Sequence, residues 1–214
     1  MSGSSYRRRA IETYDVLHQQ VTDRGPWQQT ASGRAFFLGD PRPEEVRIED
    51  IAHALSNQCR YNGHTKEFYS VAQHAYLVSK WMEEDGWSPE LCYAGLHHDS
   101  AEAYTGDIVT QIKHIVPELR GMVYGVEVAV ERALGIRRTD YIARLAIKRY
   151  DLIALATERR DLMPENTTEF VWGDMPAPRE ARIIPHGPRR AERAFLVRHW
   201  ALVRKMEEMF DGSR

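Results

Sequence analysis

Residues 96–107 have the sequence LHHDSAEAYTGD, which is predicted to complete a helix over about 90–104. Side chains four positions apart share a helix face, so His98 and Glu102 should lie together, with Asp99 beside them. An imidazole and two carboxylates gathered on one buried surface are costly without a counter-charge. A divalent cation would offset that cost, because both group types are good ligands for first-row metals. The same residues are also compatible with a solvated histidine beside two surface acids.

The preceding helix is predicted over about 68–84, with His74 on its apolar, inward-facing stripe. A tight Gly-Trp-Ser-Pro connection at 86–89 joins the two helices, which should therefore pack as antiparallel neighbours. Gly95 leaves room for their close approach, and His74 would then face His98. The alternative for His74 is a core histidine bonded to a backbone carbonyl.

A third helix, predicted over 141–162, carries Asp151 in the middle of an apolar stripe. An inward carboxylate at this position fits a fourth metal ligand, whereas the alternative is a buried aspartate paired with Arg144 or Lys148. Lys148 stands one turn before Asp151 and suits phosphate binding by point charge. A plain salt bridge on the helix surface explains Lys148 equally well.

Helical periodicity dominates the rest of the chain, so we expect an all-α fold, a helical bundle, in one domain over 1–214. The motif-bearing core should cover about 47–162, and the proline-rich segment 163–188 should form a loop or flap. Further helices are predicted over 8–22, 48–56, 117–135 and 189–210.

A minor β hairpin or flap is expected beside the helices, with short strands at 34–38, 170–172 and 182–184. The final helix is expected to bury one apolar stripe, made of Phe195, Leu196, Trp200, Val203 and Met206.

The composition excludes several classes of protein. The formal net charge of −2 argues against binding along a nucleic-acid backbone, which needs a basic surface. Cys59 and Cys92 form no CxxC pair, so a cysteine-type zinc site is not expected, and two lone thiols fit a reducing cytosol. No secretory signal and no apolar run of membrane-spanning length is visible. We therefore expect a cytoplasmic protein without membrane partners.

The order His…His-Asp…Asp, together with three further stretches, resembles the HD family of metal-dependent phosphohydrolases. The block 96–107 resembles bacterial 5′-deoxynucleotidases and small phage-type deoxyadenosine-triphosphate hydrolases, and 51–56, 63–65 and 69–74 resemble the phage-type branch. The resemblance covers about 47–158, roughly half of the chain, and it implies that the helices form an HD-type bundle.

The resemblance implies a role for each candidate residue. Glu102 would be the general acid/base, Asp107 would position water or the sugar, and His64 is a further group that could approach the site. One divalent metal ion (Mn, Fe, Co, Ni or Zn) would be held by His74, His98, Asp99 and Asp151. Phosphate would be contacted by Arg60, Lys113 and Lys148.

The implied partner is a small-molecule nucleotide, with no polymeric nucleic acid, and a homo-oligomer is expected. The favoured function is hydrolysis of deoxynucleoside 5′-monophosphates or deoxynucleoside triphosphates. One alternative is a catalytically inactive HD scaffold that binds a nucleotide or a protein partner, and another is a purely structural helical protein. Candidates for base recognition lie in loops: Trp27, Phe36, Tyr61 and Trp172.

Overall fold

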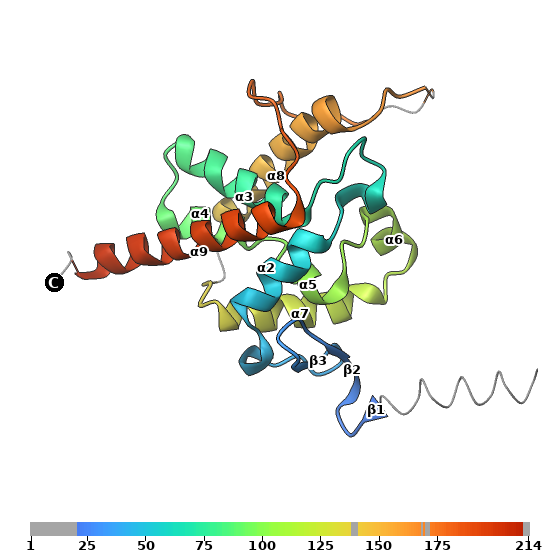
Figure 1. The fold of residues 1–214 in the computed structure, drawn as a ribbon, viewed down its shortest axis with the longest axis vertical. Helices are drawn as coiled ribbons and strands as arrows, with labels where there is room; N and C mark the ends of the chain where they lie inside the picture. Colours follow the sequence, from blue (N-terminus) through green and yellow to red (C-terminus); the bar gives the residue numbers. More distant parts are fainter. Residues whose placement is uncertain (1–20, 138–140, 168, 170–171, 212–214) are drawn as a thin grey trace, which may run out of the picture.

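The computed structural model describes residues 21–137, 141–167, 169 and 172–211, which form a helical bundle with a small antiparallel sheet at one end (Figure 1). The all-α prediction is therefore confirmed. The strands are β1 (Val21–Thr22), β2 (Gly25–Gln29) and β3 (Ala35–Phe37). The helices are η1 (Pro43–Glu45), α2 (Ile48–Asn57), η2 (Arg60–Gly63), α3 (Val71–Glu84), α4 (Pro89–Leu96), α5 (Glu102–Thr105), α6 (Thr110–Ile115), α7 (Leu119–Ala133), α8 (Tyr141–Leu162) and α9 (Pro188–Asp211).

The hairpin docks onto the bundle through an aromatic contact. The strands run in the order β1-β2-β3, and Trp27 of β2 pairs with Phe37 of β3. Phe36 faces the other side, where it is fully buried and its ring stacks on Tyr104 at 3.9 Å between centroids. The predicted strand at 34–38 is confirmed, but Phe36 belongs to the core and has no free face for a nucleobase.

Helices α2, α3, α4 and α9 pack together around the main apolar core. The tight connection between α3 and α4 folds as predicted: Gly86 has φ +83°, and the Ser88 side chain accepts a hydrogen bond from the backbone N–H of Leu91. Gly95 lets the two helices approach, because a Cβ at this position would lie 2.5 Å from Met82 Sδ.

We therefore expect Gly95→Ala to lower the free energy of unfolding by about 1–3 kcal/mol, the usual range for overpacking a core. Met82 is fully buried, so its thioether would have to shift within the packed core to make room for a Cβ. Gly121→Ala is the matched control, because its Cβ would meet nothing within 4 Å on helix α7. At position 121 only the higher helix preference of alanine should act, so Gly121→Ala should raise the free energy of unfolding by about 0.5–1 kcal/mol. Urea unfolding of both variants measures the difference, and equal effects would contradict the packing role of Gly95.

The helix predicted over 90–104 is broken into α4 and α5. Between them the backbone tightens into turns, in which Ser100 N–H donates to His97 O at 3.1 Å and Glu102 N–H donates to Asp99 O at 3.0 Å. Both bonds span three residues rather than the four of an α-helix. The helix α4 therefore ends at Leu96 with His97 as its C-cap, and His98 and Asp99 lie on a turn rather than on a helix face.

The proline-rich segment runs along α8 and α3 without forming the strand predicted at 182–184. Its backbone groups bond to side chains instead of to a second strand. Ile183 N–H donates to Asp161 Oδ2 at 2.9 Å, while Gln73 donates to Ile184 O at 2.8 Å and accepts from His186 N–H at 2.7 Å.

Several other element predictions change. The helix over 8–22 lies mostly outside the described residues, and its last two positions form β1. The strand at 170–172 falls largely outside them too. Helix α3 begins at Val71 instead of 68, and α6 was not predicted. On α9, Phe195 is buried and Leu196, Val203 and Met206 pack partly buried against the core, but Trp200 is 54% exposed.

Among the described residues, none of the helices combines the length and the apolar character that crossing a bilayer demands.

Candidate functional site

Four donor side chains from three separate segments of the helical bundle converge on one another. His74 comes from α3, His98 and Asp99 from the turn after α4, and Asp151 from α8. His74 Nε2 lies 3.3 Å from His98 Nε2 and 3.3 Å from Asp151 Oδ1. Asp99 Oδ2 lies 3.1 Å from His98 Nε2 and 3.6 Å from His74 Nε2. The bundle thus brings together all four residues that the sequence marked as candidate metal ligands.

Both imidazole rings are held so that their Nε2 atoms face the cluster. His98 Nδ1 donates to the carbonyl oxygen of Gly95 at 2.8 Å, and His74 Nδ1 donates to Glu158 Oε1 at 2.6 Å. A carbonyl and an ionised carboxylate can only accept, so each Nδ1 carries the proton of a neutral ring. Each Nε2 then presents a lone pair toward the centre. Such orientation by a second partner is typical of metal-binding histidines.

This arrangement fits one small divalent cation. Donor atoms that bind a cation at about 2.0–2.2 Å lie about 3–4 Å from one another, depending on the angle between them. Five pairs among these donors, up to the 3.9 Å between His98 Nε2 and Asp151 Oδ1, fall in that range. The ligand atoms of His74, His98 and Asp99 all lie within 4.8 Å of one another, and Asp151 approaches this group through the two histidines. The lone pairs of His74 Nε2 and His98 Nε2 face each other across 3.3 Å, and they repel each other unless a positive charge lies between them. The mixed nitrogen and oxygen donors suit first-row transition metals.

The electrostatics of the cluster favour positive charge. Burial by itself would lower the pKa of His98, but the carboxylates of Asp99 and Asp151 outweigh it and raise that pKa to about 9. Burial opposes ionisation of Asp99 and Asp151, yet the facing imidazoles hold the pKa of both carboxyls below the usual range. The site therefore attracts either protons or a cation.

Glu102 lies at the rim of this cluster, at the start of α5. Burial, reinforced by Asp99 and Asp107, raises the pKa of Glu102 to about 9. Its Oε2 is buried and has no hydrogen-bond partner among the described residues, while Lys113 Nζ approaches Oε1 at 3.7 Å. The pKa of Asp107 is also raised, mainly by burial. A buried, protonated carboxyl beside the donor cluster has the character of a general acid.

Arg60 and Glu158 form a second buried layer behind His74. Glu158 is fully buried on α8 and accepts from His74 Nδ1, from Tyr69 Oη at 3.0 Å and from Tyr61 Oη at 2.5 Å. Arg60 Nε lies 3.3 Å from Glu158 Oε2, and Arg60 Nη1 lies 3.6 Å from Asp99 Oδ2. Burial opposes ionisation of Glu158, but Arg60 and His74 lower its pKa to about 2. This carboxylate therefore links a candidate phosphate-binding arginine to a candidate metal ligand.

Sequence reasoning missed Glu158. The signal was available, because Glu158 follows Asp151 by seven positions and so lies on the same helix face. Arg60 belongs to η2, where Tyr61 has the uncommon backbone angle φ +56°. Such left-handed residues are strained, and they cluster at functional sites.

The other candidate residues divide between the site and its surroundings. Lys148 donates to Asp151 Oδ2 at 2.6 Å, which is the salt bridge that the sequence left open as an alternative. Tyr61 and Trp172 meet edge to face, at 6.5 Å between centroids, next to the Arg60 layer. Trp27 is half-buried in the hairpin, and His64 is exposed after η2.

A cavity of about 630 Å³ opens beside the donor cluster. His98, Asp99 and Asp151 form one part of its lining, while Arg144 and Lys148 lie along the α8 side. A small-molecule site of this size is typical of proteins that bind metabolites.

Comparison with known proteins relates this site to one family. The profile of the family described as 5′-deoxynucleotidase YfbR-like matches residues 56–152, which include all four donors. The chain is similar to the uncharacterized protein YfdR of Escherichia coli, with 34% identity over 171 residues, or 79% of this chain and 92% of YfdR. It is also similar to an uncharacterized protein of Rhodobacter capsulatus, with 31% identity over 192 residues, or 84% of this chain and 97% of that protein.

Proposed function

This chain belongs to the YfbR-like 5′-deoxynucleotidase family of HD-domain proteins, and on that premise we propose that it is a metal-dependent deoxynucleotide phosphohydrolase. The family implies a nucleotide phosphohydrolase, and we propose deoxynucleoside 5′-monophosphates as the first substrates to test. The observation that supports this proposal best is the convergence of His74, His98, Asp99 and Asp151, with both Nδ1 atoms tied to acceptors.

The four donors would hold one divalent cation, which supplies Lewis-acid polarisation of a phosphoryl oxygen and lowers the pKa of water. Arg60 lies behind Asp99 with its charge directed at the same region, so it would neutralise charge that develops on the phosphoryl oxygens. Lys113, which approaches Glu102, and Lys148, which pairs with Asp151, would add to this neutralisation.

Glu102 would supply the proton for the leaving group. In the hydrolysis of a 5′-monophosphate, the oxygen of water forms a bond to phosphorus, and the bond between phosphorus and the ester oxygen breaks. The proton on the Glu102 carboxyl passes to that ester oxygen, and the nucleoside leaves as an alcohol. One proton of the attacking water stays on the phosphate product, and the other returns to the Glu102 carboxylate. Asp107, on the loop after α5, would orient water or the sugar hydroxyl, since its carboxyl interacts electrostatically with both Glu102 and Arg60.

We expect the purified protein to hold about one divalent transition metal per chain, because the four donors converge on a single site. Elemental analysis and titration of chelator-treated protein measure the content. Asp151→Asn should lower the metal affinity, while the exposed substitution Glu165→Gln serves as a control. Protein that neither contains nor takes up any divalent metal would contradict the site.

Substrate choice is tested on the metal-loaded protein with a panel of deoxynucleoside mono- and triphosphates. We expect inorganic phosphate and nucleoside from the monophosphates; release of tripolyphosphate would instead identify a triphosphate hydrolase. Nucleotide binding without either product would favour the inactive scaffold and refute the proposed enzyme.

A further inference from the structure

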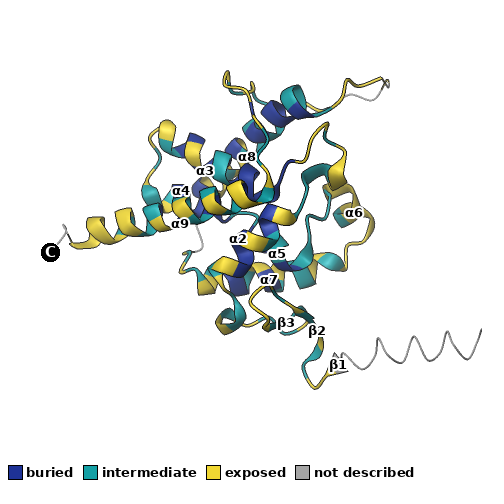
Figure 2. Ribbon diagram, in the orientation of Figure 1, coloured by how far each residue is buried: buried dark blue, intermediate teal, exposed yellow. Residues whose placement is uncertain are grey.

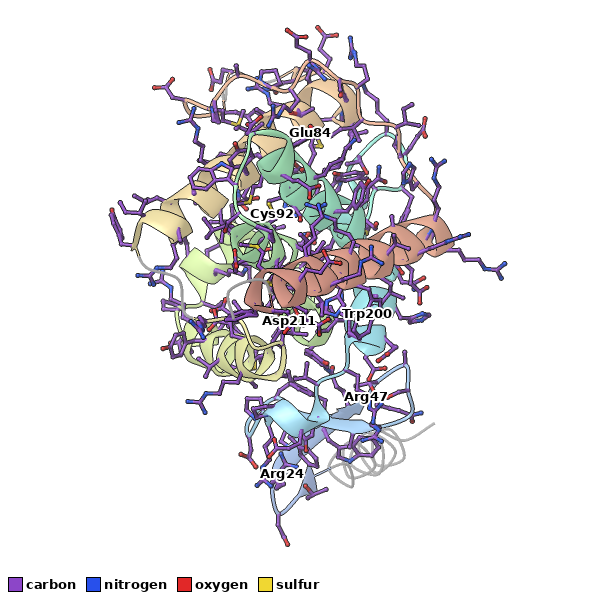
Figure 3. All side chains as sticks on the ribbon, turned by 90° about the vertical axis from the view of Figure 1, so that its left-hand side faces the viewer. Arg24, Arg47, Glu84, Cys92, Trp200 and Asp211 are labelled. Carbon is purple, nitrogen blue, oxygen red and sulfur yellow. The ribbon has the colours of Figure 1, made fainter. Side chains whose placement is uncertain are left out.

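Helix α9 packs against α4, the helix that leads into the turn with His98 and Asp99. Figure 3 shows the two helices side by side, with Trp200 labelled on α9 and Cys92 on α4. Toward its C-terminal end α9 is mostly exposed, but part of its length is buried against the bundle (Figure 2). The buried face includes His199, which is 4% exposed. A histidine so fully buried needs hydrogen-bond partners inside the protein.

The partner of His199 is His97, the C-cap residue of α4. His97 Nε2 and His199 Nδ1 lie 3.0 Å apart, and on the other side of the same ring His97 Nδ1 lies 2.8 Å from Ser100 Oγ. Burial lowers the pKa of His199 to about 4 and that of His97 well below its usual value, so both rings are neutral at neutral pH. A neutral imidazole has one donor and one acceptor nitrogen, so one proton serves each contact in this chain of three groups.

The same chain closes the turn that carries two of the candidate metal ligands. Ser100 N–H donates to His97 O at 3.1 Å, and the contact between the two side chains joins these residues a second time. His98 and Asp99 lie between them in the sequence. The directions of His98 Nε2 and Asp99 Oδ2, which are 3.1 Å apart, therefore depend on the geometry of this closed turn.

Packing of the two histidine rings is the competing explanation for their burial. The ring of Tyr93 lies 4.6 Å from that of His97 and 5.4 Å from that of His199, between centroids, and Phe195 meets His97 edge to face at 5.4 Å. An apolar side chain of similar size at position 199 would keep such contacts. It would lose the hydrogen bond to His97, so the two explanations predict different results for the same substitution.

We propose that His199 is a positioning residue for the metal site. It holds the ring of His97, and through His97 and Ser100 it holds the turn that presents His98 and Asp99. Without His199, a buried nitrogen of His97 loses its partner, and the ring is no longer fixed for its bond to Ser100. Ligands that are less well held bind a cation less tightly. The inference rests on the metal site of the proposed function, but not on the reaction.

The test is a titration of the chelator-treated full chain with Co²⁺, followed by the visible absorption of the bound ion. His199→Leu keeps roughly the volume of the side chain but loses the hydrogen bond, so the affinity for Co²⁺ should fall about tenfold, the low end of the usual effect of groups behind a ligand. His199→Asn places an amide near the former Nδ1, and an amide can donate or accept. It should keep the affinity to within about threefold of the wild type.

The absorption bands provide a readout that does not follow stability, because they depend on the geometry of the ligands around Co²⁺. They should change in His199→Leu and stay as in the wild type in His199→Asn. Ser100→Ala breaks the chain at its other end and should weaken Co²⁺ binding in the same way. This smaller substitution carries the test if His199→Leu does not fold, which circular dichroism detects.

Leu202→Ala is the matched control on the same helix. Leu202 is fully buried one turn after His199, so its truncation weakens the packing of α9 and should lower the resistance to urea. The affinity for Co²⁺ should nevertheless stay within about threefold of the wild type, because the contact between His97 and His199 remains.

Two results would overturn the positioning role: equal Co²⁺ affinity in His199→Leu and His199→Asn, or a loss in Leu202→Ala as large as that in His199→Leu. Wild-type protein that takes up no Co²⁺ would overturn the metal site and this inference together. Protein that binds Co²⁺ as expected but hydrolyses no nucleotide would overturn the proposed enzyme alone.

Discussion

Replacing Glu102 with glutamine is expected to lower kcat by about 10²–10⁴-fold while the metal content stays unchanged, the usual range for loss of a general acid. Glutamine keeps the size of the side chain but cannot deliver a proton. Glu102 is not among the four donors that face one another, so the cation should still bind. Paired measurements of metal content and kcat on the best substrate test this expectation.

The pH profile supplies a second readout. The raised pKa of Glu102 keeps its carboxyl protonated at neutral pH, so activity should fall as the pH rises and this proton is lost. The fall in activity at alkaline pH should be absent from the variant Glu102→Gln. A variant with near-normal kcat would make Asp107 the next candidate, and a variant that loses metal would make Glu102 a ligand. Asp151→Asn is the comparison that loses metal by design.

Truncation of Glu158 to alanine is expected to lower the free energy of unfolding by about 3–5 kcal/mol, as is usual when one partner of a buried ion pair is removed. The guanidinium of Arg60, the Nδ1 of His74 and the hydroxyl of Tyr69 would all lose an acceptor that is fully buried. Urea unfolding measures the loss, with the exposed Glu165→Gln as the control.

Glu158→Gln separates positioning from stability. Its amide oxygen can still accept from His74 Nδ1, but the negative charge that strengthens this bond is gone. We expect metal affinity to fall about 10–100-fold, the usual effect of altering the partner of a ligating histidine. Titration of the metal-free protein measures this, independently of activity. A variant with wild-type metal affinity would show that Glu158 serves stability alone.

Local sequence patterns predicted much of this fold. The apolar stripe over 48–56, the Gly86 and Ser88 signals between α3 and α4, and the uninterrupted periodicity over 141–162 each correspond to an observed element. All three depend on residues a few positions apart, so the sequence contains the information directly. The break after α4 escaped prediction because the residues 97–101 are compatible with a helix, and only their bonds to neighbouring groups select the turns.

The sequence by itself identified the candidate metal ligands, since His74, His98, Asp99 and Asp151 stand on predictable helices or beside their ends. The tertiary structure alone decided how those side chains are held. His74 receives its orientation from Glu158, 84 positions away, and Arg60 lies beside Asp99 only because η2 packs against the end of α8.

Trp200 was expected in the core from its spacing, but α9 extends past the bundle and leaves it exposed. Periodicity assigns a residue to a face of a helix, whereas the packing of distant segments decides what, if anything, covers that face.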